Sequence, residues 1–101
     1  TGQHAATVQF VEGQLQRFPN DGRLHRLAAK SYAALGKTMQ QHTHLGEYYA
    51  WQGNLRGAVF QYAEPSKASD GDFYQASVVE ARLRTLRREL AEQLANSDKS
   101  G

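Results

Sequence analysis

Histidines are the first side chains in this sequence to test for chemistry, because they are the commonest metal ligands. They stand at positions 4, 25, 42 and 44. His42 and His44 point to different faces of a helix, whereas a helical zinc pair needs ligands at i and i+4 and a third from elsewhere. His44 and Glu47 share one face at i and i+3, a spacing that is common on solvated helices. We therefore expect surface or packing histidines, with no metal and no other cofactor in this chain.

The sequence also offers few residues for acid-base or nucleophilic catalysis. The chain has no cysteine, which excludes thiolate nucleophiles, thiolate zinc sites and disulfides. Asp70 and Asp72 fall in a turn, where capping of the next helix accounts for at least one of them. The serines at 31, 66, 69 and 77 lack a nucleophile elbow, and no glycine-rich loop fits a phosphate. We expect that this chain is not an enzyme, and we assign no catalytic and no cofactor-binding residue.

The elements that must position any site are predicted to be helices. Ala occurs fourteen times and Gln ten, Ile is absent, and β-branching is limited to five Val and five Thr. Turn residues divide the chain at 19–22, 36–37, 53–54 and 69–72. The pattern predicts an all-α fold of about five short helices, at roughly 5–18, 22–35, 38–52, 55–67 and 72–95. We expect one domain over 1–96 and a disordered tail over 97–101.

Helix ends can be read from capping residues. Thr38 with Gln41, and Asp72 with Gln75, match the spacing of a capping box at a helix start. Gly36 and Gly53 suit the left-handed position that ends a helix. Because the loops between helices are short, successive helices should form antiparallel hairpins.

The two helix-ending glycines are seventeen residues apart, which is half of the 34-residue period of tetratricopeptide (TPR) repeats. In a frame from Met39 to Asp72, the chain resembles this repeat at its Leu-Gly, Tyr, Gly, Ala and aromatic positions, which here are Leu45, Gly46, Tyr49, Gly53, Ala58 and Tyr62. Pro65 departs from the pattern. Upstream residues fit a frame shifted by half a period, so which helix opens a repeat stays open. The resemblance implies helix pairs stacked as a TPR-like solenoid.

A longer resemblance covers about Leu24 to Arg87. The strings LAAKSYAALGK, HLGEYYAWQGNLRGAVFQY and GDFYQASVVEARLRTLR are similar to the C-terminal TPR region of periplasmic zinc metallopeptidases of the beta-barrel assembly-enhancing protease type. Those enzymes carry a His-Glu-x-x-His helix, which this sequence lacks. The resemblance implies a non-catalytic part of a longer chain, with zinc in a catalytic domain that is absent here. It also implies a periplasmic location and contacts with the protease domain and with outer-membrane assembly components.

The net charge and the hydropathy of the chain do not indicate a particular class of binding partner. The formal net charge is +2 with interleaved signs, and no apolar run approaches the ~18 residues of a membrane span. The first residues lack a signal-peptide pattern, and without an initial Met we expect a segment of a longer chain. Arginines gather near the C-terminus, but acidic residues at i,i+4 offset them, so nucleic-acid binding is only a weak alternative.

The last predicted helix carries an apolar stripe that should face the core: Val79, Leu83, Leu86, Leu90 and Leu94. The remaining face is most simply a solvated surface, with a coiled-coil partner as the second interpretation. We expect Phe73 and Tyr74 to anchor the start of this helix under the preceding hairpin.

Candidate partner-binding residues lie on the second and third helices. On the third helix, Gln40, His44, Glu47 and Trp51 form one row opposite Leu45 and Tyr49, at positions that line the groove of TPR proteins. On the second helix, Leu24, Leu27, Ala28, Ser31 and Leu35 should be buried, which leaves Arg23, Arg26 and Lys30 as an exposed row. Trp51 is either an exposed hot spot or tucked under the Gly53 turn.

The sequence thus predicts a non-catalytic protein-interaction module. It would recruit or position a protein or peptide for an attached zinc metalloprotease in outer-membrane protein quality control, with Arg23, Arg26, Lys30, Gln40, His44, Glu47 and Trp51 as one recognition surface. The alternative is an element for self-association or for docking on the parent protein.

Overall fold

The computed structural model describes residues 2–64 and 73–100, and within them it contains five α-helices and no strand. The fold is all-α, as the sequence predicts. The helices are α1 (Gly2–Arg17), α2 (Gly22–Ala34), α3 (Thr38–Trp51), α4 (Leu55–Ala63) and α5 (Phe73–Ser100).

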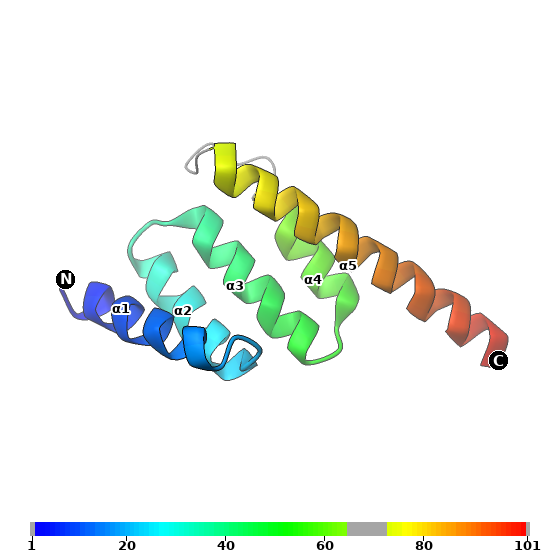
Figure 1. The fold of residues 1–101 in the computed structure, drawn as a ribbon, viewed down its shortest axis with the longest axis horizontal. Helices are drawn as coiled ribbons and strands as arrows, with labels where there is room; N and C mark the ends of the chain where they lie inside the picture. Colours follow the sequence, from blue (N-terminus) through cyan, green and yellow to red (C-terminus); the bar gives the residue numbers. More distant parts are fainter. Residues whose placement is uncertain (1, 65–72, 101) are drawn as a thin grey trace.

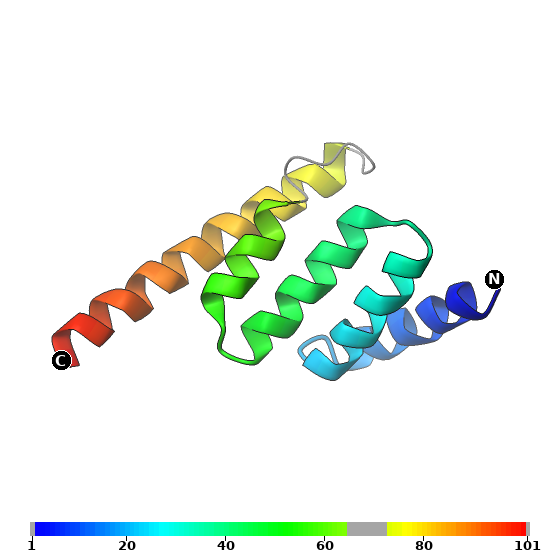
Figure 2. The ribbon, with the colours of Figure 1, turned by 180° about the vertical axis from the view of Figure 1, so that it is seen from behind.

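Each helix packs on the next one in the chain, from α1 to α5. Figures 1 and 2 show the helices following one another across the molecule, with α3 in the middle and the second half of α5 extending beyond α4. The molecule measures 51 × 26 × 20 Å. Such nearest-neighbour stacking of helix hairpins is the arrangement of helical repeats.

The turns after α2 and α3 are set by glycines at positive φ. Gly36 has a φ of 73° and Gly53 a φ of 81°, values that favour glycine because it lacks a Cβ. After α2, the Lys37 amide donates to the Tyr32 carbonyl at 2.9 Å, and after α3 the Asn54 amide donates to the Tyr49 carbonyl at 2.9 Å. These are Schellman closures, and they confirm the predicted helix ends.

Helix starts are only partly as predicted. The N-cap of α3 is Lys37, without a side-chain hydrogen bond, and Thr38 is already the first helical residue, so the predicted capping box at Thr38 is wrong. Asp21 caps α2 by accepting from the Arg23 amide, and Asn54 caps α4 by accepting from the Gly57 amide. The second predicted capping box begins at residue 72, outside the described residues.

The apolar interior consists of two clusters. One joins α1 and α2 through Val11, Leu15 and Ala28. The larger one joins α3, α4 and α5 through Met39, Ala58, Tyr62, Val79, Leu83 and Leu86. Each cluster is small, because the helices are short and only their neighbours cover them.

The closest helix approach lies between α3 and α4. A Cβ added at Gly46 would stand 2.5 Å from Cδ2 of Tyr62, and Ala58 opposite is fully buried. The small size of Gly46 and Ala58 thus allows α3 and α4 to approach closely around the Tyr62 ring.

Two helix boundaries differ from the prediction. The described part of α4 ends at Ala63 with its C-cap at Glu64, and residues 65–67 of the predicted helix lie outside the described residues. Helix α5 continues to Ser100 instead of ending near 95, so residues 97–100 are helical in the structure. Neither Gly nor Pro occurs between Leu94 and Ser100, so no residue type there breaks the helix.

The burial pattern of α5 follows how much of its length is covered. Val79, Leu83 and Leu86 are buried, whereas Leu90 is half-buried and Leu94 is exposed, because the second half of α5 extends past α4. Phe73 and Tyr74 are 87% and 74% exposed, so their predicted anchoring role is wrong. On α2, Leu27 is also exposed, although its spacing predicts burial.

We expect Gly46→Ala to destabilise the fold by about 1–3 kcal/mol, since the new methyl group must displace the buried Tyr62 ring. Thermal or urea unfolding followed by circular dichroism measures this change. Gly13→Ala is the matched control: Gly13 lies inside α1 with no atom near its Cβ position, so alanine should stabilise by about 0.5–1 kcal/mol. An unchanged stability in Gly46→Ala would contradict the close approach of α3 and α4.

Candidate functional site

His44 on α3 connects three helices through polar contacts. Its Nε2 lies 3.0 Å from Oε1 of Glu12 on α1, and its Nδ1 lies 2.9 Å from Nδ1 of His25 on α2. The ring also stacks on Tyr32, with centroids 5.4 Å apart. Tyr32 in turn donates its hydroxyl to Glu12 Oε1 at 3.1 Å. The His44 side chain is only 15% exposed, so it is an interior contact rather than part of a solvated row.

The two facing histidines require a shared proton. His25 Nε2 lies 2.8 Å from the Pro19 carbonyl oxygen, which can only accept, and His44 Nε2 faces a carboxylate, which also accepts when ionised. One of the two Nδ1 atoms must therefore donate to the other for their contact to form, and Glu12 lies on the far side of the His44 ring.

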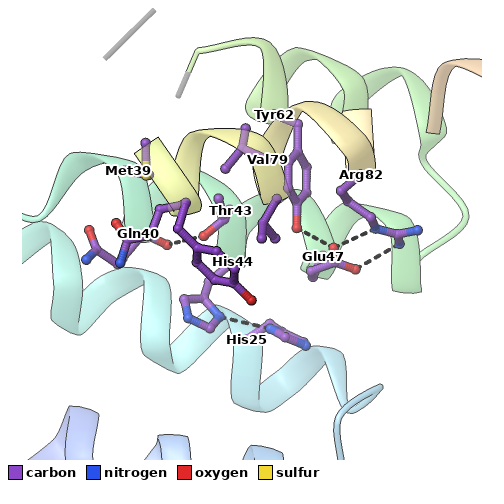
Figure 3. A pocket seen from close by; sticks show the side chains of 12 residues that line it. His25, Met39, Gln40, Thr43, His44, Glu47, Tyr62, Val79 and Arg82 are labelled. Carbon is purple, nitrogen blue, oxygen red and sulfur yellow. Dashed lines mark hydrogen bonds and ion pairs between the residues drawn. The ribbon is translucent and has the colours of Figure 1, made fainter. Parts of the chain in front are cut away.

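Glu47 connects α3 to the helices on the other side. Arg82 on α5 donates from Nε and Nη2 to the two carboxylate oxygens of Glu47, at 2.8 and 2.9 Å. The Tyr62 hydroxyl on α4 also donates to Glu47. A two-point guanidinium contact of this kind fixes geometry as well as charge. Figure 3 shows this arrangement next to the His25 and His44 contact.

The pKa values of these groups follow their surroundings. Burial opposes ionisation of Glu47, but hydrogen bonds from Arg82 and Tyr62 outweigh it and lower the pKa of its carboxyl. Burial of Tyr62, with the Glu47 charge beside it, raises the pKa of its hydroxyl. Burial and then the Glu12 charge raise the pKa of Tyr32 to about 12. Burial, with His25 nearby, lowers the pKa of His44 despite the attraction of Glu12.

A groove of about 420 Å³ lies between α3 and the first half of α5. Its apolar lining includes Met39, Tyr62 and Val79, and Gln40, His44, Glu47 and Arg82 supply polar groups (Figure 3). Val78 and Tyr74 on α5 are exposed there, at 52% and 74%. The groove is thus a surface with an apolar base and fixed donors and acceptors, a composition common in binding sites.

The basic row of α2 lies beside a different part of α3. Arg23, Arg26 and Lys30 are exposed and border a hollow with Leu27, Tyr48 and Trp51. Trp51 is 52% exposed, yet one side of its ring covers Gly22, whose added Cβ would stand 2.3 Å from Trp51 Cδ2. Trp51 therefore packs on Gly22 of α2 and not under the Gly53 turn, where no atom lies within 4 Å of the Gly53 Cβ position. That its exposed side is a binding hot spot stays a prediction.

The structure therefore divides the predicted recognition surface into two. Gln40, His44 and Glu47 line the α3–α5 groove, whereas the three cations border the α2–α3 hollow with Tyr48 and Trp51. Glu47 and Trp51 meet only at a third, smaller hollow of about 250 Å³. The prediction that the two rows lie together is wrong because α3 is covered from both sides: α2 approaches Tyr48, and α5 approaches Glu47. Whether these seven residues bind a partner stays a prediction.

Sequence reasoning missed Arg82, His25 and Tyr62 as members of the groove. Arg82 follows Gln75 and Val78 at helical spacing on α5, so that face could have been found by periodicity. No sequence signal indicates that it faces Glu47.

Among the described residues, no group of three His, Cys, Asp or Glu side chains is placed to hold a metal ion. In the same part of the chain, no helix has both the length and the apolar character that crossing a membrane requires.

Comparison with known proteins gave no match to a family model, a curated protein or a solved structure.

We expect acidification to destabilise the fold in the interval just below about pH 6.5, the ordinary pKa of a histidine side chain. The pKa of His44 is lowered from its ordinary value of 6.5, so the unfolded chain binds more protons than the folded chain in this interval. Proton binding lowers the free energy of the unfolded chain relative to the folded one, and the free energy of unfolding therefore falls. The groups facing His44 are Glu12, His25 and Glu47; the lowered pKa of Glu47 acts below its ordinary value of 4.5, outside this interval.

Melting temperatures across this interval test the expectation. His44→Gln should reduce the pH dependence, whereas His4→Gln, a change at an exposed histidine near the N-terminus, should leave it unchanged. The same pH slope in all three proteins would contradict the assignment to His44.

Proposed function

We propose that this chain is a non-catalytic protein-interaction module that binds a peptide segment in the groove between α3 and α5. The observation that carries this proposal is the groove itself, where exposed Val78 and Tyr74 stand over buried Met39, Tyr62 and Val79. Apolar side chains of a peptide would be removed from water there.

The polar groups of the groove suit a peptide backbone. Gln40 offers both a donor and an acceptor, and the guanidinium of Arg82 is held in place by Glu47. Because these contacts already exist without a partner, little side-chain entropy is lost when a peptide binds. Stacked helix pairs commonly present extended binding surfaces of this kind.

We further propose the wider role that the resemblance over Leu24 to Arg87 implies. The module would recruit or position partners or substrates for an attached zinc metalloprotease in the periplasm, as part of outer-membrane protein quality control. What supports this role is the similarity of the residue strings alone.

The second candidate is a surface for self-association or for docking on the parent protein. Leu94 favours it, because this leucine is 41% exposed on the part of α5 that extends past α4 (Figure 1). Nucleic-acid binding is a weaker third candidate, because the net charge is only +2.

Peptides selected from a random display library against the full chain test the groove. We expect them to shift the amide resonances of Thr43 and Val79, and we expect Val78→Glu to weaken their binding about tenfold or more, since a charge then stands on the apolar lining. Val78 is half exposed, so stability should change by less than about 0.5 kcal/mol.

Leu94→Glu is the matched control, with the same kind of change on the same helix outside the groove lining. It should leave peptide binding unchanged. Equal binding by Val78→Glu and the unchanged protein would contradict the groove. A stable dimer that only Leu94→Glu dissociates would favour self-association instead.

A further inference from the structure

A second surface, on the α2–α3 face, combines cations with aromatic rings. Two adjoining hollows of about 320 and 390 Å³ share Arg26, Lys30 and Tyr48 in their linings. The guanidinium carbon of Arg26 lies 5.7 Å from the Tyr48 ring centroid, and the Tyr48 and Trp51 rings are stacked with centroids 6.2 Å apart. These ring contacts position the Arg26 guanidinium, and the charged groups lie at the edge of the hollows.

The charges of Arg26 and Lys30 on this surface are not balanced by a neighbouring acid in the described part of the chain. Neither hollow is lined by Asp or Glu. Within residues 2–64 and 73–100, Arg26 and Lys30 form no ion pair. Arg23 contacts both carboxylate oxygens of Asp21, from Nε and Nη2, each at 3.4 Å. Arg26 and Lys30 differ in this respect from Arg82, which forms an ion pair with the half-buried Glu47.

We infer that the α2–α3 face is a second docking site, separate from the groove, that binds an acidic protein segment carrying an apolar side chain. Carboxylates of the segment pair with Arg23, Arg26 and Lys30, which follow one another at i, i+3 and i+7 along about 10 Å of α2. Its apolar side chain packs on Leu27 and on the exposed side of Trp51, which are 41% and 52% exposed.

A protein segment fits this surface better than a nucleic acid does. Single-stranded nucleic acids are held by bases that stack on free aromatic faces. Here Arg26 and Trp51 already occupy Tyr48, and Trp51 covers Gly22 with one side. Three cations also supply few phosphate contacts in a chain whose net charge is only +2.

The α2–α3 hollows share no lining residue with the proposed groove, although Trp51 also borders a third hollow with Glu47 and Arg82. One partner in the groove and a different, acidic partner on the α2–α3 face could be bound together. The two sites can therefore be tested one at a time.

Trp51 is the only tryptophan in the chain and lies at this site, so its fluorescence measures binding directly. The probe is a short synthetic peptide in which aspartates and glutamates flank a leucine, titrated into the full chain. We expect saturable change of Trp51 fluorescence, and about tenfold weaker binding by the double variant Arg26→Ala with Lys30→Ala.

The matched control is Arg84→Ala with Arg88→Ala, which removes the same charge from exposed positions on α5. It should bind the acidic peptide as tightly as the unchanged protein does, and Val78→Glu, the groove variant, should too. A peptide with lysines in place of the acids should not bind.

Three results would overturn the inference. The acidic peptide could leave Trp51 fluorescence unchanged, the Arg84 and Arg88 double variant could lose as much affinity as the Arg26 and Lys30 one, or a single-stranded oligonucleotide could bind this face more tightly than the peptide. None of them bears on peptide binding in the groove.

Discussion

The polar row of α3 is the interaction on which the rest of this fold depends. The apolar interior is divided, with one cluster between α1 and α2 and another among α3, α4 and α5. Across this division, His44 contacts Glu12 and His25, while one helical turn later Glu47 contacts Tyr62 and Arg82. Helix α3 is therefore linked by side-chain polar contacts to all four other helices, and two small cores become parts of one structure.

This arrangement couples stability to the candidate site. The same His44 and Glu47 that join the helices also line the groove, so its polar groups are held in place by the fold. Buried polar contacts of this kind are costly when incomplete and specific when satisfied. Here no buried side-chain nitrogen or oxygen of the described residues lacks a partner. The α2–α3 face is built differently, since its cations remain exposed and only the rings beneath them are packed.

Much of the fold could be predicted from local sequence rules, because those rules act within a few residues. Gly36 and Gly53 end helices for a backbone reason, and Gly46 with Tyr62 follows from the size of side chains at a helix contact. Periodicity correctly placed Gln40, His44 and Glu47 on one row of α3. It could not tell which helix covers that row, since the positions of α1 and α5 depend on packing over long separations.

The errors share this cause. Leu27 has the spacing of a buried residue, but no helix covers it, and Phe73 and Tyr74 remain exposed at the start of α5. His44 and Glu47 look like surface residues by type, yet Glu12 and Arg82 reach them from helices distant in the sequence. Trp51 could not be assigned from its row alone, because Gly22 on α2 receives one side of its ring.

Native-state hydrogen exchange tests the central claim most directly, namely that the polar row of α3 unites the two cores. The protected amides near Val11 and Ala28 in one core, and near Ala58 and Leu86 in the other, should open with the same free energy, equal to that of global unfolding. If the α1–α2 amides open at a clearly lower free energy while those of α4 and α5 stay protected, the cores unfold separately and the account is contradicted.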